Sequence, residues 1–421
     1  MNEQNLAGFV QRRCSALVRL AIAAVLSASM VGALPAAHPA RAQNEIFDLA
    51  SFYQTDLRAL AMGNAYGPVA RGEGALLYNP AGLVQFDRDI KIDASLAVEG
   101  EQGDFFSDTV DQLTESPTPQ EVKAYLSKYN GTSQFYRAQT FGNFVANLAD
   151  INVGFGVGVM TQTRFEFIFT DVNNDGYTPP DGNQDSLTLN QDELDINFLS
   201  FAFQIFDGQL LIGATAKSFT LTRESSTAFF DTINDIDLAG AVPDTYDASG
   251  LDLGFIWRLE TLSFLRGQIS TTALNVGGIT LENQTNDPSK TLEVPATYNV
   301  GIAISPELPW SPVHLLLSVE LEDATGAIKV RDPLDGLDHD RSSTQRLHFG
   351  AELGIWRTST GNNLLSARVG SHRGRAAFGF ELNLFSALRI LYTQYGDNFG
   401  HEDEKDLHDF EAVQISFGFG F

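Results

Sequence analysis

The sequence predicts an all-β protein, a transmembrane antiparallel β-barrel of about fourteen strands with an N-terminal segment below or inside it. Three observations lead to this fold class. The chain opens with an export signal, most of it alternates between apolar and polar residues with a period of two, and the links between the alternating segments are long and short in turn. A period of two is typical of strands with one apolar face, and a closed barrel is the form in which strands cross a membrane.

Residues 1–42 have the features of a signal peptide. Arginines precede an apolar run at 20–34, and the segment closes on Ala40-Arg41-Ala42, so we expect cleavage before Gln43. The run is shorter than the ~20 residues of a spanning helix, which argues against a membrane anchor. Cys14 would leave with the peptide, and the exported chain would then hold no cysteine for disulfides, thiolate metal sites or nucleophiles.

The chain is strongly acidic, with 53 Asp and Glu residues against 27 Lys and Arg residues and a formal net charge of −26. A nucleic-acid partner is therefore not expected, because neutralising phosphates requires a basic footprint. Such acidity fits solvated loops, cation binding or a salty habitat. No second long apolar run follows residue 43, so a membrane location has to rest on strand patterning.

The alternation is clearest at the C-terminus. The odd positions from Val413 to Phe421 are all apolar, and the residues between them are polar or small. A last strand that ends on phenylalanine also resembles the C-terminal signal of bacterial outer-membrane proteins. The alternative, the last strand of a soluble sandwich, is disfavoured because the same pattern recurs along most of the chain. The predicted strands fall near 89–98, 133–148, 153–169, 192–206, 209–223, 248–259, 262–275, 295–305, 312–323, 343–356, 361–371, 374–384, 386–396 and 413–421.

The links between these segments support a membrane barrel, because outer-membrane barrels have short periplasmic turns and long extracellular loops. Long links at 99–132, 170–191, 224–247, 276–294 and 324–342 alternate with short ones, and only the short link at 372–374 departs from the series. Both chain ends then lie on the periplasmic side. Residues up to Phe86 must therefore lie below or inside the barrel.

That N-terminal piece carries a recognisable block, RALAMGNAYGPVARGEGALLYNPAGLVQF at 58–86, with Asn79-Pro80-Ala81-Gly82 near its end. The block resembles the signature shared by the FadL long-chain fatty-acid transporters and the PorV/PorQ family. The segments at 347–356 and 366–382 are more similar to PorV. After the signal peptide at 1–42, the resemblance implies a hatch or plug at 43–87 tucked inside the barrel and a fourteen-stranded outer-membrane barrel at 88–421.

The residues of the block suit a hatch. Its glycines permit close backbone approaches, and Pro80 fixes φ and removes a hydrogen-bond donor, so the corner at 79–82 cannot continue a helix or a strand ladder. We expect this segment to seal the lumen. Whether it also moves is left open by the sequence.

Two of the long links contain features of their own. Thr118-Pro119-Gln120-Glu121 resembles a helix start, and it precedes Val122, Tyr125, Leu126 and Tyr129 at helical spacing. This predicts a short amphipathic helix over the extracellular mouth, whose apolar face either meets a ligand or packs on neighbouring loops.

The link at 171–185 opens like a calcium-binding loop. Asp171, Asn173 and Asp175 occupy its first, third and fifth positions, followed by a glycine at the sixth. The twelfth position is Gly182 instead of glutamate, so Asp181 or Asp185 would have to complete the site. A calcium site and a plain polar turn both remain open. Calcium is the only cofactor that the sequence suggests.

Four predicted strands carry one charge each, out of phase with their apolar face: Glu352, Arg368, Glu381 and Arg389. Inward positions of a barrel alternate with lipid-facing ones, so all four should point into the lumen. Their distances from the turns suggest pairing between neighbouring strands. We expect a ladder of ion pairs that leaves any apolar path to the opposite wall.

An enzyme is the weakest interpretation. A barrel hydrolase needs a serine and a histidine within reach of each other, and after residue 43 only His314 and His348 fall inside predicted strands. Two functions remain. One is a FadL-type outer-membrane barrel for passive uptake of hydrophobic molecules, with membrane lipids and a long-chain ligand as its partners. The other is a PorV/PorQ-like component of protein secretion or surface attachment, with a secretion-system partner.

Overall fold

The computed structural model describes residues 45–46, 53–85, 90–101, 133–170, 186–229, 239–240, 243–262, 265–285, 290–306, 312–331, 338–357, 363–384, 387–398 and 407–420. The proposed signal peptide lies outside the described residues.

Fourteen strands close into one antiparallel barrel, which confirms the predicted fold class. The strands follow one another in chain order, and the first pairs with the last from Lys91 opposite Gly420 to Glu101 opposite Phe410. In order, the strands are β2 (Ile90–Glu101), β3 (Ser133–Leu148), β4 (Val153–Thr170), β5 (Ser186–Ile205), β6 (Leu210–Phe229), β8 (Asp244–Leu262), β9 (Leu265–Leu274), β12 (Thr297–Pro306), β13 (Val313–Leu321), β16 (Leu347–Arg357), β17 (Asn363–His372), β18 (Arg375–Leu384), β19 (Leu388–Asn398) and β20 (Leu407–Gly420).

The exterior is apolar, as the alternation predicts. On β20, Val413, Phe417 and Phe419 are 45%, 58% and 67% exposed, whereas Ala412 and Ser416 are buried. The other strands repeat this outward display with residues such as Phe201 and Phe380. A soluble protein rarely exposes apolar surface of this extent, so the outer face is suited to lipid.

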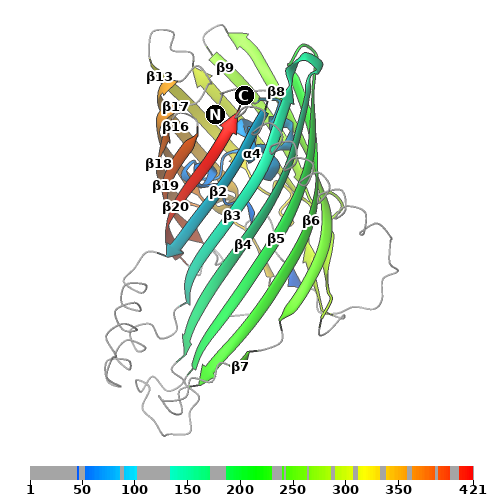
Figure 1. Cartoon of the computed structure of the whole chain (residues 1–421), viewed down its shortest axis with the longest axis vertical. Helices are drawn as coiled ribbons and strands as arrows, with labels where there is room; N and C mark the ends of the chain where they lie inside the picture. The colour runs from blue at the N-terminus through cyan, green and yellow to red at the C-terminus, as the bar shows by residue number, and fades with distance from the viewer. Residues whose placement is uncertain are drawn as a thin grey trace, which may run out of the picture.

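One side of the barrel is taller than the other (Figure 1). β5 and β6 have 20 residues each, whereas β13 has 9. The links predicted at 170–191 and 224–247 were therefore too long, because 186–191, 224–229 and 244–247 belong to strands. Where these extensions begin, the outward face already carries polar residues, because the Thr220 hydroxyl donates to Asp247 Oδ1 at 2.8 Å. The apolar alternation that marks a strand in the lipid is therefore weak there.

Some of the remaining long links contain structure. β10 (Ile279–Asn283) and β11 (Thr291–Val294) form a hairpin, and β1 (Glu45–Ile46) pairs parallel with β11. Short strands occur at β7 (Ala239–Gly240), β14 (Lys329–Arg331) and β15 (Asp338–Asp340). The predicted strand at 343–356 instead opens with one helical turn, α7 (Ser343–Arg346). Ser342 and Gln345 form a capping box that starts this turn.

The N-terminal segment lies inside the barrel and is called the hatch below. It consists of α3 (Leu57–Ala61), η1 (Gly67–Val69), α4 (Glu73–Leu77) and η2 (Pro80–Gln85), and nearly all its described side chains are buried. Both the hatch and the C-terminal end of β20 lie toward the same end of the barrel (Figure 1). A further single turn, η3 (Ala149–Ile151), links β3 to β4. In the described part of the chain, no helix has the length and apolar character to cross a membrane.

Candidate functional site

The corner at 79–82 packs against two glycines of the barrel wall, which have no side chains. Gly213 on β6 and Gly254 on β8 are register partners, and a Cβ added at Gly254 would lie 2.1 Å from Asn79 Oδ1. At Gly213 it would lie 2.4 Å from the backbone of Pro80 and Ala81. The hatch therefore meets the wall backbone to backbone here, at what we call the first glycine seat.

Asn79 holds the shape of this corner. Its side chain is fully buried, and Nδ2 donates to Gly67 O at 3.2 Å and to Phe255 O of the wall at 3.4 Å. Its Oδ1 accepts from Ala81 N at 3.1 Å. One side chain thus joins two hatch segments to β8, which gives the predicted hatch motif a definite structural position.

A second glycine seat lies on the other side of the lumen. Gly350 on β16 and Gly370 on β17 are register partners, and a Cβ on either would lie 2.3 to 2.4 Å from the backbone of Met62 or Gly63. Gly63 itself has φ +63°, a conformation that favours glycine. The two seats leave no space between hatch and wall at these points.

Three of the four charges expected in a ladder form a connected row in the lumen. Arg368 Nε lies 2.7 Å from Glu352 Oε2, and Arg368 Nη2 also pairs with Glu381. The side chains of all three are at most 8% exposed. Arg58 of α3 extends the row, because its Nε donates to Glu352 at 2.9 Å. The row therefore attaches the hatch to the wall.

Arg389 does not pair with Glu381, which corrects the expected order of the ladder. Its Nη1 lies 2.6 Å from Oε1 of Glu73, in α4 of the hatch. Lys91 of β2 reaches the other oxygen of Glu73 at 2.5 Å. Burial alone would raise the pKa of Glu73, but Lys91 and Arg389 hold it well below its usual range. Glu73 is thus an ionised carboxylate between two cations of the wall.

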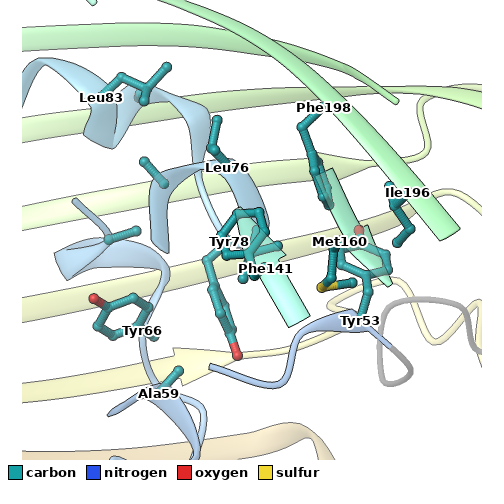
Figure 2. Packing of buried hydrophobic residues seen from close by; sticks show 14 of the residues in the cluster. Tyr53, Ala59, Tyr66, Leu76, Tyr78, Leu83, Phe141, Met160, Ile196 and Phe198 are labelled. Carbon is teal, nitrogen blue, oxygen red and sulfur yellow. The ribbon is translucent and has the colours of Figure 1, made fainter. Parts of the chain in front are cut away.

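The opposite wall of the lumen carries a large apolar cluster. Side chains from β3, β4 and β5 pack against Tyr53, Leu76 and Tyr78 of the N-terminal segment (Figure 2). They include Phe141, Met160, Ile196 and Phe198, which are at most 4% exposed. Sequence patterning predicts the inward charges of the other wall but not this cluster, because inward apolar residues interrupt the alternation that marks a strand.

One cation lies within the apolar wall. Lys217 of β6 has no exposed side-chain surface, and its Nζ lies 2.7 Å from Asp252 Oδ2 and 2.7 Å from Tyr53 Oη. The same ammonium lies 4.7 Å from the centre of the Tyr53 ring. This contact ties the start of the described hatch to β6. No sequence signal singles out Lys217, because its partners lie far away along the chain.

The residues suggested for calcium, Asp171, Asn173, Asp175 and Asp181, lie outside the described residues, as do Val122, Tyr125, Leu126 and Tyr129 of the expected mouth helix. Within the described ranges, no group of three or more His, Cys, Asp or Glu side chains is arranged to hold a metal.

A serine and a histidine do meet inside the barrel. Ser305 Oγ lies 3.1 Å from His314 Nε2, at the end of β12. The hydroxyl also donates to Leu315 O at 2.9 Å, so its proton is already used by the backbone. A nucleophile needs that proton directed to its base, so this pair has the geometry of a structural contact.

Comparison with known proteins gives a result at the level of structure only. No protein-family model matches the chain, and no curated protein matches it. Many solved structures match, among them three that each cover most of both chains. A deltaS2 mutant of the TodX monoaromatic hydrocarbon channel has 13% identity and a TM-score of 0.53, with 89% of this chain and 100% of that chain covered.

The other two matches are similar in extent. A deltaS2S3 mutant of the TodX channel has 12% identity and a TM-score of 0.51, covering 87% of this chain and 98% of that one. The Ralstonia pickettii toluene transporter TbuX has 13% identity and a TM-score of 0.50, covering 90% and 99%.

The closed barrel, its apolar exterior and its internal hatch define the class: the chain is a β-barrel of the bacterial outer membrane. Within that class its fold is FadL-like, as the hatch block suggests.

Proposed function

We propose that this barrel lets hydrophobic small molecules enter passively across the outer membrane. The observation that carries the proposal is the division of the lumen into two walls. One wall is ion-paired to the hatch through Glu352 and Glu73, and the other presents aromatic and aliphatic side chains such as Phe198 to Tyr53. A hydrophobic molecule would gain little binding free energy from contact with the first wall and much from contact with the second.

The route would follow the apolar wall. Displacing apolar contacts between Tyr53 and β5 leaves no charge without a partner, whereas separating Arg58 from Glu352 would leave the buried Arg58 without its carboxylate. Polar contacts on that side include those of Tyr53 with Lys217 and of Thr55 with Gln139 and Gln162. Movement of the hatch would therefore begin near Tyr53, while the ion-paired side stays in place.

The fold neighbours support this class of ligand. Their titles name monoaromatic hydrocarbon channels and a toluene transporter. The hatch block resembles that of long-chain fatty-acid transporters, so we propose a hydrophobic ligand without assigning it to either chemical group. We propose no catalytic role, because the pair of Ser305 and His314 lacks a hydroxyl proton directed to the base.

The test is to identify what the purified barrel carries. The protein would be extracted from outer membranes in a mild detergent and washed, and its bound small molecules would be identified by mass spectrometry. An unrelated barrel prepared in the same way gives the background of membrane lipids. A long-chain or aromatic hydrophobe enriched over that background supports uptake. A stoichiometric secretion component without such a ligand would favour the PorV-like role instead.

A further inference from the structure

The side chain of Tyr53 occupies a site for one aromatic ring in the apolar cluster of the lumen. Its ring centre lies 6.3 Å from that of Phe198 on β5 and 6.3 Å from that of Phe219 on β6. Tyr53 is fully buried, and Phe198 meets it edge-on at an interplanar angle of 61° (Figure 2). Aromatic pairs favour such inclined arrangements. The wall therefore recognises the ring by its shape and its edge contacts.

The polar end of the Tyr53 side chain meets a buried ammonium group. Lys217 Nζ donates to Tyr53 Oη at 2.7 Å and lies 5.3 Å from the centre of the Phe219 ring. The Lys217 side chain has no exposed surface. A hydrogen bond to a charged group stabilises more than one between two neutral groups. The site therefore binds both a ring and an oxygen acceptor at one edge of that ring.

The charge of Lys217 is already balanced within the wall. Asp252 Oδ2 and Tyr53 Oη each lie 2.7 Å from Lys217 Nζ, and Asp252 Oδ1 accepts from Asn275 N at 2.9 Å. A carboxylate in the place of the Tyr53 hydroxyl would put a second buried anion close to Asp252, which is costly without a second cation. A neutral hydroxyl brings no such cost. The site therefore favours a neutral acceptor over an anion.

Tyr53 belongs to the hatch, whereas the groups around it belong to the barrel wall. Phe198, Phe219, Lys217 and Asp252 lie on β5, β6 and β8, so they stay in place if the start of the hatch moves. Withdrawal of Tyr53 would leave the ion pair of Lys217 and Asp252 intact. It would remove one acceptor from Nζ and one ring from the two phenylalanines. A molecule that supplies both an acceptor and a ring would restore these contacts.

We propose that Tyr53 fills a binding site for neutral phenols, and that a phenol takes its place when the start of the hatch withdraws. The ring of the phenol packs beside Phe198 and Phe219, and its oxygen accepts from Lys217 Nζ. This inference deepens the proposed function, on which it rests, because it names a class of hydrophobic ligand. The tyrosine side chain cut at Cβ is 4-methylphenol, so that compound is the matched probe.

The test is binding to the purified barrel by equilibrium dialysis in one detergent at neutral pH. Radiolabelled 4-methylphenol, toluene and 4-methylbenzoate share a methylated ring and differ in a hydroxyl, a hydrogen or a carboxylate. An unrelated barrel gives the background of uptake into micelles. We expect 4-methylphenol to bind about tenfold more tightly than toluene, as one hydrogen bond to a charged group predicts. Binding of 4-methylbenzoate should not exceed the background.

Tyr53→Phe tests whether the ligand competes with the hatch. The variant keeps a ring in the site but loses the acceptor for Lys217, so the hatch yields the site more readily. Both 4-methylphenol and toluene should then bind about tenfold more tightly, because the competition is common to both. The matched control is Tyr66→Phe, which removes another buried hatch hydroxyl that accepts from a cation, Arg58 Nη1 at 3.3 Å. It should leave both affinities unchanged.

A double variant tests the role of the ammonium group. Lys217→Met with Asp252→Asn removes both charges together, and the asparagine oxygen can still accept from Asn275 N. The preference for 4-methylphenol over toluene should disappear, whereas binding of toluene should persist.

Equal binding of 4-methylphenol and toluene to the parent, or no binding of 4-methylphenol above background, would overturn the proposal. So would unchanged affinities in Tyr53→Phe, a preference that survives the loss of both charges, or tight binding of 4-methylbenzoate. Equal binding of the two neutral compounds would leave the proposed function standing. Passive entry is tested separately by uptake into whole cells, so the two proposals can fail independently.

Discussion

Arg389 of the wall and Glu73 of the hatch form an ion pair, with 2.6 Å between Nη1 and Oε1. In the strand register, Arg389 lies opposite Asn383, whereas Glu381 lies opposite Leu391. The two-residue offset separates Arg389 from Glu381, and α4 brings Glu73 into the space. The wall is therefore ion-paired to the hatch at two separate points, through Glu352 with Arg58 and through Arg389 with Glu73.

Removing one partner of this ion pair should lower the free energy of unfolding. Removing both should lower it by less than the sum of the two single losses. Glu73→Gln should lower the free energy of unfolding by about 3 kcal/mol, because it leaves Arg389 buried without its carboxylate. Arg389→Gln should lower it by less, because Lys91 still pairs with Glu73. The double variant should show positive coupling. Urea titrations of the barrel in lipid vesicles, followed by tryptophan fluorescence, measure all four proteins. Additive losses would mean that the pair does not hold the hatch.

The same carboxylate predicts an acid sensitivity. The pKa of Glu73 is held below its usual range by Lys91 and Arg389, against the opposing effect of burial. Its stabilising contribution is therefore complete above the ordinary carboxyl pKa and is lost as the pH falls through the lowered value. Unfolding free energies measured between pH 3 and pH 7 should fall toward acid in the parent and fall less steeply in Glu73→Gln. Identical slopes would rule out this role.

The first glycine seat can be tested by adding one methyl group. Gly254→Ala would place Cβ 2.1 Å from Asn79 Oδ1, so the corner at 79–82 must shift. We expect a loss of about 1–3 kcal/mol and faster entry of hydrophobic dyes into whole cells. Gly142→Ala is the matched control, because nothing lies within 4 Å of its added Cβ. Equal dye entry in the two variants at equal surface abundance would contradict the seat.

The strands could be predicted from the sequence because side chains point inward and outward in alternation. Apolar residues therefore recur at every second position, as on β20. The tall extensions at 186–191 and 224–229 could not, since they leave the lipid band and lose their apolar face. The row of Glu352, Arg368 and Glu381 follows from strand phase alone. The partner of Arg389 does not, because it depends on how the hatch folds back into the lumen.

The other contacts between hatch and wall could not be predicted either, because they also depend on how the hatch folds back into the lumen. Gly213 and Gly254 look like ordinary inward glycines until the corner at 79–82 is placed upon them. In the sequence His348 is only a strand histidine, because its partner Gly63 O comes from a segment far away along the chain. Inward glycines on adjacent strands are the one signal that could have indicated a seat.

The possible calcium loop gives a further prediction, which rests on the sequence alone. If Asp171, Asn173 and Asp175 bind calcium, Asp175→Ala should leave the barrel folded but remove calcium-dependent protection of residues 170–191 from protease. Limited proteolysis with calcium and with chelator measures this effect. An unaltered cleavage pattern in the parent on adding calcium would mean that the segment is a polar turn.

Uptake by whole cells shows whether hydrophobic molecules enter passively through this barrel. Cells lacking the protein and cells producing it would be given a long-chain fatty acid, toluene and a small sugar, each radiolabelled, with and without a protonophore. We expect cells that produce the protein to take up at least one of the two hydrophobic compounds faster at first, insensitive to the protonophore, with no change for the sugar. Equal uptake of both hydrophobic compounds in the two strains, with the barrel folded and abundant at the surface, would contradict it.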